Sequence, residues 1–238
     1  MDDKAVKKIL LHIYERLISR YGPQKWWPAE GTFEVIVGAI LTQSAAWTNV
    51  EKAIRNLKAS GKMSPGAIHQ LPQEELAQII RPSGYYNVKA KKLQAFVRWL
   101  EAQYSYDLKE LFNIETSQLR KQLLGIFGIG EETADSIILY AANKPVFVID
   151  AYTRRIIRHA GLAPRENSYA AYQTLFMGNL PADTELFNEY HALLVRLGKD
   201  VCKTRPMCDQ CCLNITETTV AELAHIEFPC SIINQPCS

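Results

Sequence analysis

The feature that most constrains this chain is a glycine turn between two helical patterns, followed after a short apolar run by an acidic residue. The turn is Gly-Ile-Gly at 128–130, and the segment 131–142 after it has apolar residues at helical spacing. The apolar run 145–149 then leads into Asp150, at the start of another helical pattern. Glycine N–H groups and the positive end of a helix together suit phosphate binding. The stretch therefore predicts a nucleic-acid-binding turn with a carboxylate close to it.

Composition and charge set broad limits on the fold and the partners. The 238 residues suffice for one large or two modest domains, and 47% hydrophobic with 22% charged residues is ordinary for a soluble globular protein. No apolar run reaches about 18 residues, so we expect no membrane partner. The first residues lack the apolar core of a secretory signal, which predicts a cytoplasmic, nucleoid-associated protein. The net charge of +2 identifies no partner, since a nucleic-acid binder can concentrate its basic residues on one face.

Hydrophobic periodicity predicts helices along almost the whole chain. The clearest patterns lie at 4–21, 33–43 and 87–104. The β-branched residues in 33–43 allow a strand locally, but its apolar character all round and its helical neighbours favour a buried helix. In 87–104 the pattern places Val88 inward and Lys89 on the outer face. Predicted N-caps of two later helices are Asn167-Ser168 and Asp183.

All six cysteines lie between position 202 and the C-terminus. A disulfide framework would spread through the chain, so the clustering predicts metal or cluster ligation in a reducing compartment.

The stretch 124–150 resembles the helix-hairpin-helix and the following Gly/Pro-Asp loop of the endonuclease III superfamily of DNA glycosylases. Other segments match in the order that the family has them: a buried helix ending in a glutamine, a G-x-Y-N-x-K-A segment, and an iron–sulfur loop. In this chain they lie at 33–43, 84–90 and 202–211. The hairpin alone is less specific, because it recurs in non-catalytic DNA binders.

This resemblance, which covers roughly residues 5–212, implies an all-α, two-lobed helix-hairpin-helix glycosylase fold. One lobe is expected to be a six-helix bundle over 30–143 that ends in the hairpin. The other is expected to combine 1–29 with 144–238, including the C-terminal cysteines.

Within the superfamily the chain is most similar to the 3-methyladenine DNA glycosylase III branch. Two tryptophans and a proline precede the buried helix, an aromatic residue follows its terminal glutamine by four positions, and the hairpin reads Gly-Ile-Gly-Glu-Glu-Thr-Ala. The similarity implies a base pocket with aromatic walls and a supporting lysine. These pocket residues are Trp26, Trp27, Trp47 and Lys199.

The mechanism implied by the resemblance depends on Glu132. Bifunctional members carry a lysine there, two residues after the second hairpin glycine, which attacks the sugar C1′ and forms a Schiff base. A carboxylate cannot form an imine. The resemblance therefore implies a monofunctional enzyme in which Asp150 stabilises positive charge on the sugar and orients or activates a water. The expected substrate is an alkylated purine such as 3-methyladenine, flipped out of damaged double-stranded DNA by a monomeric protein.

Several of these residues also have simpler interpretations. Taken alone, Asp150 is more often a helix N-cap, a role compatible with catalysis. Tryptophans at 26 and 27 are more often core, and Lys199 is more often a solvated lysine in a last helical turn. The expected DNA contacts are the backbone of Gly128 and Gly130, Thr133, Arg154, and Gln43 as the side chain that fills the vacated base stack.

The cysteines match the family least well. The family loop is C-x6-C-x2-C-x5-C, whereas only five residues separate Cys202 from Cys208, and Glu217 stands at the fourth position. Cys211 fits, and Cys230 is the candidate distant ligand. The four thiols are expected to hold a structural 4Fe–4S cluster that the chemistry does not need.

Two alternatives stay open on sequence alone. One is a glycosylase for oxidised or mismatched bases on the same scaffold, with lyase activity. The other, of a different class, is a non-catalytic helix-hairpin-helix protein that binds DNA.

Overall fold

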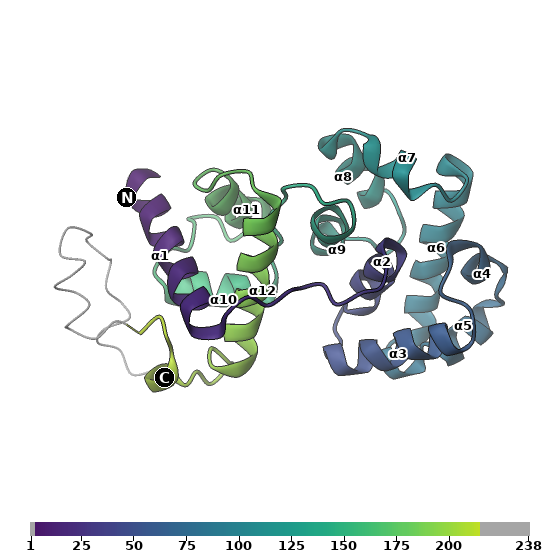
Figure 1. Ribbon diagram of the computed structural model, residues 1–238, viewed down its shortest axis with the longest axis horizontal. Coiled ribbons are helices and arrows are strands. Elements are labelled where there is room, and N and C mark those ends of the chain that lie inside the picture. Colours follow the sequence, from purple (N-terminus) through teal and green to yellow (C-terminus); the bar gives the residue numbers. More distant parts are fainter. Residues whose placement is uncertain (1–2, 215–238) are drawn as a thin grey trace. The chain divides into compact units, whose positions relative to one another are not determined.

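A computed structural model describes residues 3–214, and all regular structure within this range is helical (Figure 1). The predicted all-α class is therefore confirmed. None of the helices in this range is long and apolar enough to cross a membrane. The chain forms two compact units, one made of Met1–Trp26 with Pro145–Ser238 and the other of Trp27–Lys144.

The Trp27–Lys144 unit begins with a helix that is buried on all sides. Every residue of α2 from Phe33 to Leu41 is buried, because α2 packs against α3, α6, α9 and the segment η2. The helix ends at Leu41, so Gln43 lies in the turn after it rather than in the helix. The α-helices of this unit are α2 (Thr32–Leu41), α3 (Trp47–Ala59), α4 (Pro65–Gln70), α5 (Gln73–Ile79), α6 (Tyr86–Tyr104), α7 (Leu108–Asn113), α8 (Thr116–Leu124) and α9 (Glu131–Ser136). Two further elements are the 3₁₀ turn η1 (Arg81–Ser83) and the π-helical segment η2 (Ile137–Ala141).

The first turn of α6 differs from the sequence prediction. Val88 is 46% exposed, whereas Lys89 is only 2% exposed. The Lys89 ammonium donates to the carbonyl oxygens of Leu41, at 2.8 Å, and Ser83, at 2.6 Å. These bonds close the carbonyl end of α2 and compensate for the burial of the ammonium. Burial, and secondarily the charge of Lys92, lower the pKa of Lys89 to about 8.

The other unit has an aromatic core beneath the run that leads to Asp150. Phe147 stacks on Phe176 with ring centroids 3.9 Å apart, and the Tyr190 hydroxyl donates to Leu10 O at 2.8 Å. These contacts tie the run before Asp150 to α11 and join α12 to α1. The elements of this unit are α1 (Asp3–Tyr21), α10 (Ala151–His159), α11 (Tyr169–Met177), α12 (Thr184–Asp200) and the 3₁₀ turn η3 (Cys208–Gln210).

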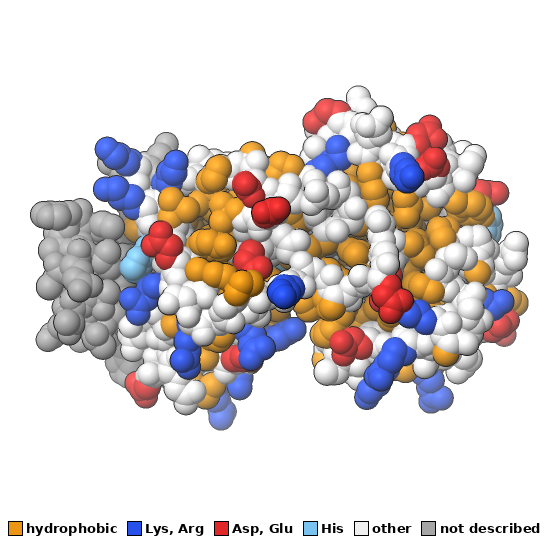
Figure 2. Space-filling model, in the orientation of Figure 1, with side chains coloured by type: hydrophobic (Ala, Val, Ile, Leu, Met, Phe, Trp, Pro, Cys, Tyr) orange, Lys and Arg blue, Asp and Glu red, His pale blue; other side chains and the backbone are white. Residues whose placement is uncertain are grey.

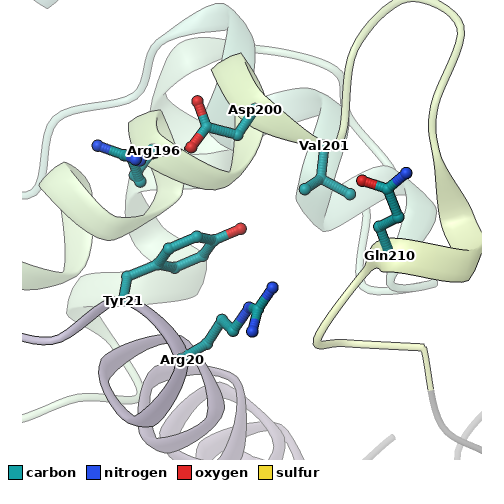
Figure 3. A pocket seen from close by; sticks show the side chains of 6 residues that line it. All are labelled: Arg20, Tyr21, Arg196, Asp200, Val201 and Gln210. Atoms are coloured by element: carbon teal, nitrogen blue, oxygen red, sulfur yellow. Dashed lines mark hydrogen bonds and ion pairs between the residues drawn. The ribbon is translucent and has the colours of Figure 1, made fainter.

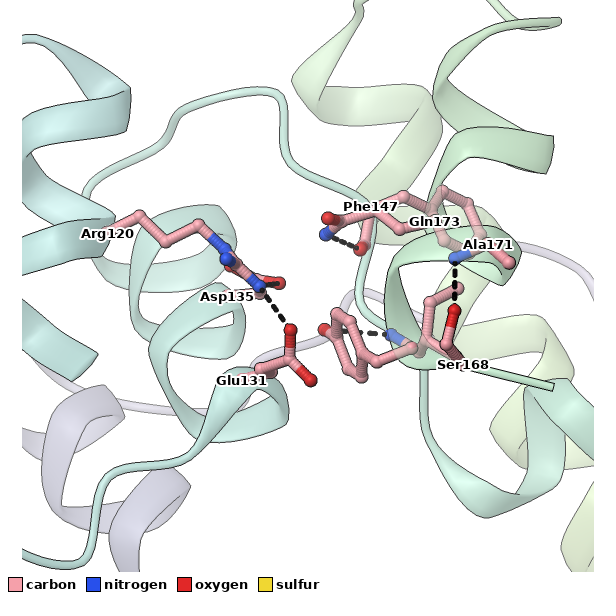
Figure 4. Close-up of polar contacts among 9 residues, drawn as sticks. Arg120, Glu131, Asp135, Phe147, Ser168, Ala171 and Gln173 are labelled. Carbon is pink, nitrogen blue, oxygen red and sulfur yellow. Dashed lines mark hydrogen bonds and ion pairs between the residues drawn. The ribbon is translucent and has the colours of Figure 1, made fainter. Parts of the chain in front are cut away.

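Both predicted N-caps are confirmed. The Ser168 hydroxyl accepts from Ala171 N at 3.2 Å (Figure 4), and the Asp183 carboxylate accepts from Leu186 N at 2.8 Å. Each side chain satisfies a backbone donor that the start of a helix leaves open.

Candidate active site

Asp150 is the N-cap of α10, where its backbone is extended and its carboxylate Oδ1 accepts from Thr153 N at 2.7 Å. The side chain is largely buried, with the residue 8% exposed. The chain before it is held by two side chains of α11, since Ile149 N donates to the Tyr169 hydroxyl at 3.2 Å and Gln173 Nε2 donates to Phe147 O at 2.8 Å (Figure 4). The carboxylate therefore has a fixed place at the positive end of a helix.

The second oxygen of the Asp150 carboxylate faces His191. Its Oδ2 lies 3.7 Å from His191 Nε2, and both side chains are buried. Burial lowers the pKa of His191, and the neighbouring carboxylate acts in the opposite direction. His191 was not among the residues predicted from the sequence, because a lone histidine on the apolar face of α12 gives no local signal of function.

A close approach of α10 and α12 brings these two side chains together. Gly198 of α12 packs directly against the Tyr152 ring, and a Cβ at position 198 would overlap the ring atoms. Arg155 bridges the same helices, donating to Gly198 O at 3.1 Å and Cys202 O at 2.7 Å. Arg155 therefore binds the carbonyl end of α12.

Arg154, the predicted phosphate contact on α10, is half-buried. Its guanidinium donates to Asn167 O at 3.3 Å and lies 5.4 Å from the centre of the Tyr172 ring. These contacts orient the side chain without burying it, so it stays a candidate for binding phosphate.

The predicted hairpin joins α8 to α9 through Gly128, Ile129 and Gly130. Gly128 has φ +82°, a left-handed conformation that disfavours other residues, and the aliphatic stem of Lys92 lies where a Cβ would stand. Ile129 is buried, and α9 begins after Gly130 without a side-chain cap. The turn is therefore anchored by its middle residue, while the start of α9 carries no capping side chain.

An ion pair holds the two hairpin helices together. Arg120 of α8 donates through Nε to the fully buried Asp135 carboxylate at 2.7 Å, and it also reaches Glu131 at 3.3 Å (Figure 4). The bidentate geometry to Asp135 fixes the angle between the helices.

The structure brings Gln43 against two other predicted DNA-contact residues, Gly128 and Thr133. Its Nε2 donates to Gly128 O at 3.1 Å and to Thr133 Oγ1 at 2.9 Å. Lys92 Nζ donates to the other end of the same amide, Gln43 Oε1. The Gln43 side chain is thus held against the hairpin, and Lys92, which was not predicted as a site residue, holds its other end.

The predicted aromatic pocket residues divide between the two units. In the Trp27–Lys144 unit, Trp27 lies edge-on to Trp47 with ring centroids 5.2 Å apart, and 5.3 Å from Tyr140. In the other unit, Lys199 Nζ lies 5.9 Å from the centre of the Trp26 ring. All of these rings are half-buried. Tyr140 was not predicted; it lies in the π-helical segment η2, a type of turn that is frequent at functional sites.

A further aromatic residue missed by the sequence analysis is Tyr85, in the G-x-Y-N segment. It is 74% exposed and has φ +44°, which is unusual for a residue with a Cβ. In the sequence Tyr85 is marked only by the glycine before it, because exposure and backbone conformation are properties of the fold.

The first turn of α9 contains Glu132, the residue that the sequence resemblance aligns with the lysine of bifunctional enzymes. Glu131 and Glu132 are both exposed there, at the positive end of the helix. Because the positive end of a helix stabilises acidic side chains, the presence of these two carboxylates needs no catalytic explanation.

The cysteines within residues 3–214 do not form a cluster site. Cys202 is buried with its sulfur 3.6 Å from His159 Nδ1, whereas Cys208 is exposed and Cys211 is half-buried. No three metal-ligating side chains gather in the described part of the chain. The candidate fourth ligand, Cys230, and the Glu217 position lie outside the described residues. The described residues therefore leave the predicted 4Fe–4S cluster unconfirmed.

A surface cavity of about 470 Å³ lies elsewhere in the unit that contains Asp150, and no predicted site residue lines it. Arg20 and Tyr21 at the end of α1 face Arg196 and Asp200 of α12 across it (Figure 3). Arg196 donates to Asp200 at 2.5 Å, so part of the local positive charge is already balanced. On the face drawn in Figure 2, basic side chains are scattered among acidic ones over both units, consistent with the low net charge.

Comparison with known proteins gives a consistent family. Residues 37–182 match the family described as HhH-GPD superfamily base excision DNA repair protein. A Methanocaldococcus jannaschii protein provisionally named a DNA repair glycosylase is 42% identical over 206 residues, which are 86% of this chain and 93% of that protein. Endonuclease III of Sulfolobus acidocaldarius is 29% identical over 181 residues, 75% of this chain and 78% of the relative.

Two solved structures extend the comparison to the fold. The H. pylori 3-methyladenine DNA glycosylase bound to 1,N6-ethenoadenine has a TM-score of 0.67 and 26% identity, covering 84% of this chain and 98% of that one. A non-covalent endonuclease III–DNA complex has a TM-score of 0.75 at 20% identity, covering 92% of this chain and 98% of that one. The second likeness shows the fold alone.

Proposed function

This chain belongs to the HhH-GPD superfamily of base excision DNA repair proteins and is a DNA glycosylase, and we propose that it releases an alkylated purine and leaves the DNA strand whole. The substrate we favour is 3-methyladenine in double-stranded DNA, bound by the protein as a monomer. The observation that carries this choice is the group of aromatic rings formed by Trp27, Trp47 and Tyr140.

Electron-rich rings suit a cationic base. N-alkylation at N3 gives the purine a positive charge, and each contact of a cation with an aromatic face contributes about 0.5–2 kcal/mol, depending on desolvation. Trp26, with Lys199 near its ring, supplies a further aromatic surface in the other unit. The likeness to the H. pylori glycosylase supports the same substrate class.

The chemistry of such a base requires little acid catalysis. The N-glycosidic bond breaks with its electron pair moving to the base, which leaves neutral because it was cationic. A water adds to the sugar C1′, and its proton passes to the Asp150 carboxylate and then to solvent. The net reaction consumes one water and releases one proton. Asp150 contributes by stabilising the cationic sugar and orienting the water.

The strand stays intact because no amine stands at the α9 position. Glu132 cannot form the imine that leads to cleavage at an abasic site. Glu132 is exposed, so its own effect on the reaction is limited to its charge.

The hairpin and the residues around it supply the DNA contacts in this proposal. Gly128 and Gly130 bind a phosphate through backbone N–H groups, without reading sequence, and the buried Thr133 supports them through its bond with Gln43. Gln43 enters the stack vacated by the flipped base. Flipping the base costs a few kcal/mol, and this cost is lowest for a damaged base. Tyr85 offers an exposed ring for stacking, and Arg154 a phosphate contact.

A panel of duplexes, each with one lesion, tests the substrate. We expect release of 3-methyladenine, with the strand cut only after alkali, and no covalent adduct when borohydride is added. Excision of an oxidised pyrimidine or a mismatched base, but not of 3-methyladenine, would reject this substrate in favour of an endonuclease III-like one. Iron and acid-labile sulfide content, measured on the same preparation, tests the 4Fe–4S cluster predicted from Cys202, Cys208, Cys211 and Cys230.

A further inference from the structure

We propose that His191 is a positioning residue that holds the Asp150 carboxylate in its reactive orientation through an Nε2–H bond to Oδ2. This inference rests on the catalytic role proposed above for Asp150. It assigns to His191 no direct contact with the substrate.

The two oxygens of Asp150 have different tasks in this arrangement. Oδ1 accepts from Thr153 N at 2.7 Å and so caps α10. Oδ2 lies 3.7 Å from His191 Nε2, a separation that a small rotation of either side chain converts into a hydrogen bond. With one oxygen held alone, the carboxylate can still rotate about that bond. A second donor at Oδ2 fixes the plane of the group.

The charge state of His191 matters as much as its position. Burial lowers its pKa, and the charged groups that act on it are Asp150 from the start of α10 and Lys199 from its own helix. Asp150 favours the imidazolium and Lys199 opposes it. A neutral imidazole donates one N–H to the carboxylate and leaves its negative charge available to a cationic sugar. An imidazolium at the same place would cancel much of that charge.

The scaffold around the pair is rigid. The neighbouring residue, Tyr190, is fully buried and bonded to Leu10 O, which fixes α12 against α1 at this level. Further along α12, the contact of Gly198 with Tyr152 sets the spacing to α10. His191 therefore approaches Asp150 from a helix that is held by contacts within the protein.

The test is a matched pair of variants, His191→Gln and His191→Met. Both side chains are unbranched, similar in length and good helix formers, but only Gln keeps an N–H donor near the Nε2 position. We expect His191→Met to lower the single-turnover rate of base release by about 10- to 100-fold, as small misplacements of a reacting group do. The dissociation constant for the lesion duplex should stay unchanged. His191→Gln should restore most of the lost rate.

Equal rates for the two variants, whether both fast or both slow, would show that His191 acts only by packing and would overturn the proposal. Asp150→Asn, measured in parallel, separates the two levels of inference. If Asp150→Asn is inactive while His191→Met matches wild type, the positioning role fails and the proposed function stands. If Asp150→Asn keeps full activity, the role of Asp150 itself fails.

A measurement on the wild-type protein covers the case in which His191→Met does not fold. Nitrogen chemical shifts of the His191 ring report its tautomer directly. The proposal requires a proton on Nε2 and none on Nδ1 at neutral pH. A ring protonated on Nδ1 alone, or on both nitrogens, would overturn it.

Discussion

Two helix starts in this protein are built in opposite ways. At α10, the Asp150 side chain caps the first turn, so the positive end of the helix carries its own carboxylate. At α9, Gly130 offers no capping side chain. The same feature of helix ends, unsatisfied N–H groups with a partial positive charge, can thus be used to hold a reactive acid or left open for an external anion such as phosphate.

The surroundings of these two helix starts also differ, since the cap of α10 is buried and the start of α9 is exposed. Asp150, the cap of α10, is buried; it bonds to Thr153 N and faces His191 of α12, and the preceding Ile149 bonds to Tyr169 of α11. The start of α9 is exposed, and it is supported from behind by Gln43 and Lys92. The proposed catalytic acid therefore lies at a buried helix start, the start of α10. The proposed phosphate site lies at an exposed helix start, the start of α9, which Gln43 and Lys92 support from the protein side.

The largest expected effect comes from Asp150→Asn. Asparagine is also a good N-cap, so the fold and the start of α10 should persist. Loss of the negative charge should lower the single-turnover rate of base release by about 10²- to 10⁴-fold, with DNA affinity retained. The measurement is base release under enzyme excess, beside a binding titration. Unchanged release would mean that the capped start has only a structural role, as the non-catalytic alternative requires.

Gly128→Ala tests the open start against a close control. The left-handed backbone costs an alanine about 1–2 kcal/mol, and its Cβ would displace the Lys92 stem. We expect a lower free energy of unfolding in a denaturant titration, together with weaker duplex binding. Gly130→Ala is the matched control, because nothing lies within 4 Å of its Cβ and its φ of −95° is ordinary. Equal losses in the two variants would show that the turn geometry is not the cause.

Lys92→Met asks whether the support beneath the hairpin matters. Methionine keeps an unbranched stem against Gly128 but removes the donor to Gln43. We expect duplex affinity to fall by about 1 kcal/mol, or roughly fivefold, more than in Lys91→Met. Lys91 is exposed, and Lys91→Met removes the same charge, so this control variant accounts for the lost long-range attraction to DNA. If the two variants bind equally, Lys92 contributes only its charge.

The smallest effect is expected from Glu132→Gln. The side chain is exposed, so excision should be unchanged and stability should shift by less than about 0.5 kcal/mol. Duplex binding should become slightly tighter, because a negative charge near the phosphate is removed. A marked loss of excision would mean that Glu132, at the start of α9, takes part in the chemistry, so the two helix starts would no longer differ in function.

Much of the fold followed from patterns that act over a few residues. The hairpin glycines, the caps at Ser168 and Asp183, and the buried helix α2 each depend on neighbours within one or two turns. Such features are readable from sequence because backbone conformation and periodicity are local.

What the sequence analysis missed depends on contacts between distant segments. Val88 and Lys89 were assigned to the wrong faces of α6, because the bonds of Lys89 to Leu41 O and Ser83 O come from the end of α2 and from η1. The approach of His191 to Asp150 likewise requires α12 to pack on α10. Neither periodicity nor propensity reports which polar group will find a partner across such a contact.

The close approach at Gly198 limits how this enzyme can diversify. Any larger residue there would push α10 away from α12 and move Asp150, which lies at the beginning of α10 and not beside Gly198. A mutational library aimed at new lesion specificities should therefore leave position 198 invariant. The half-buried aromatic positions 27, 47 and 140 can be varied more freely, because they belong to the unit that does not carry the carboxylate.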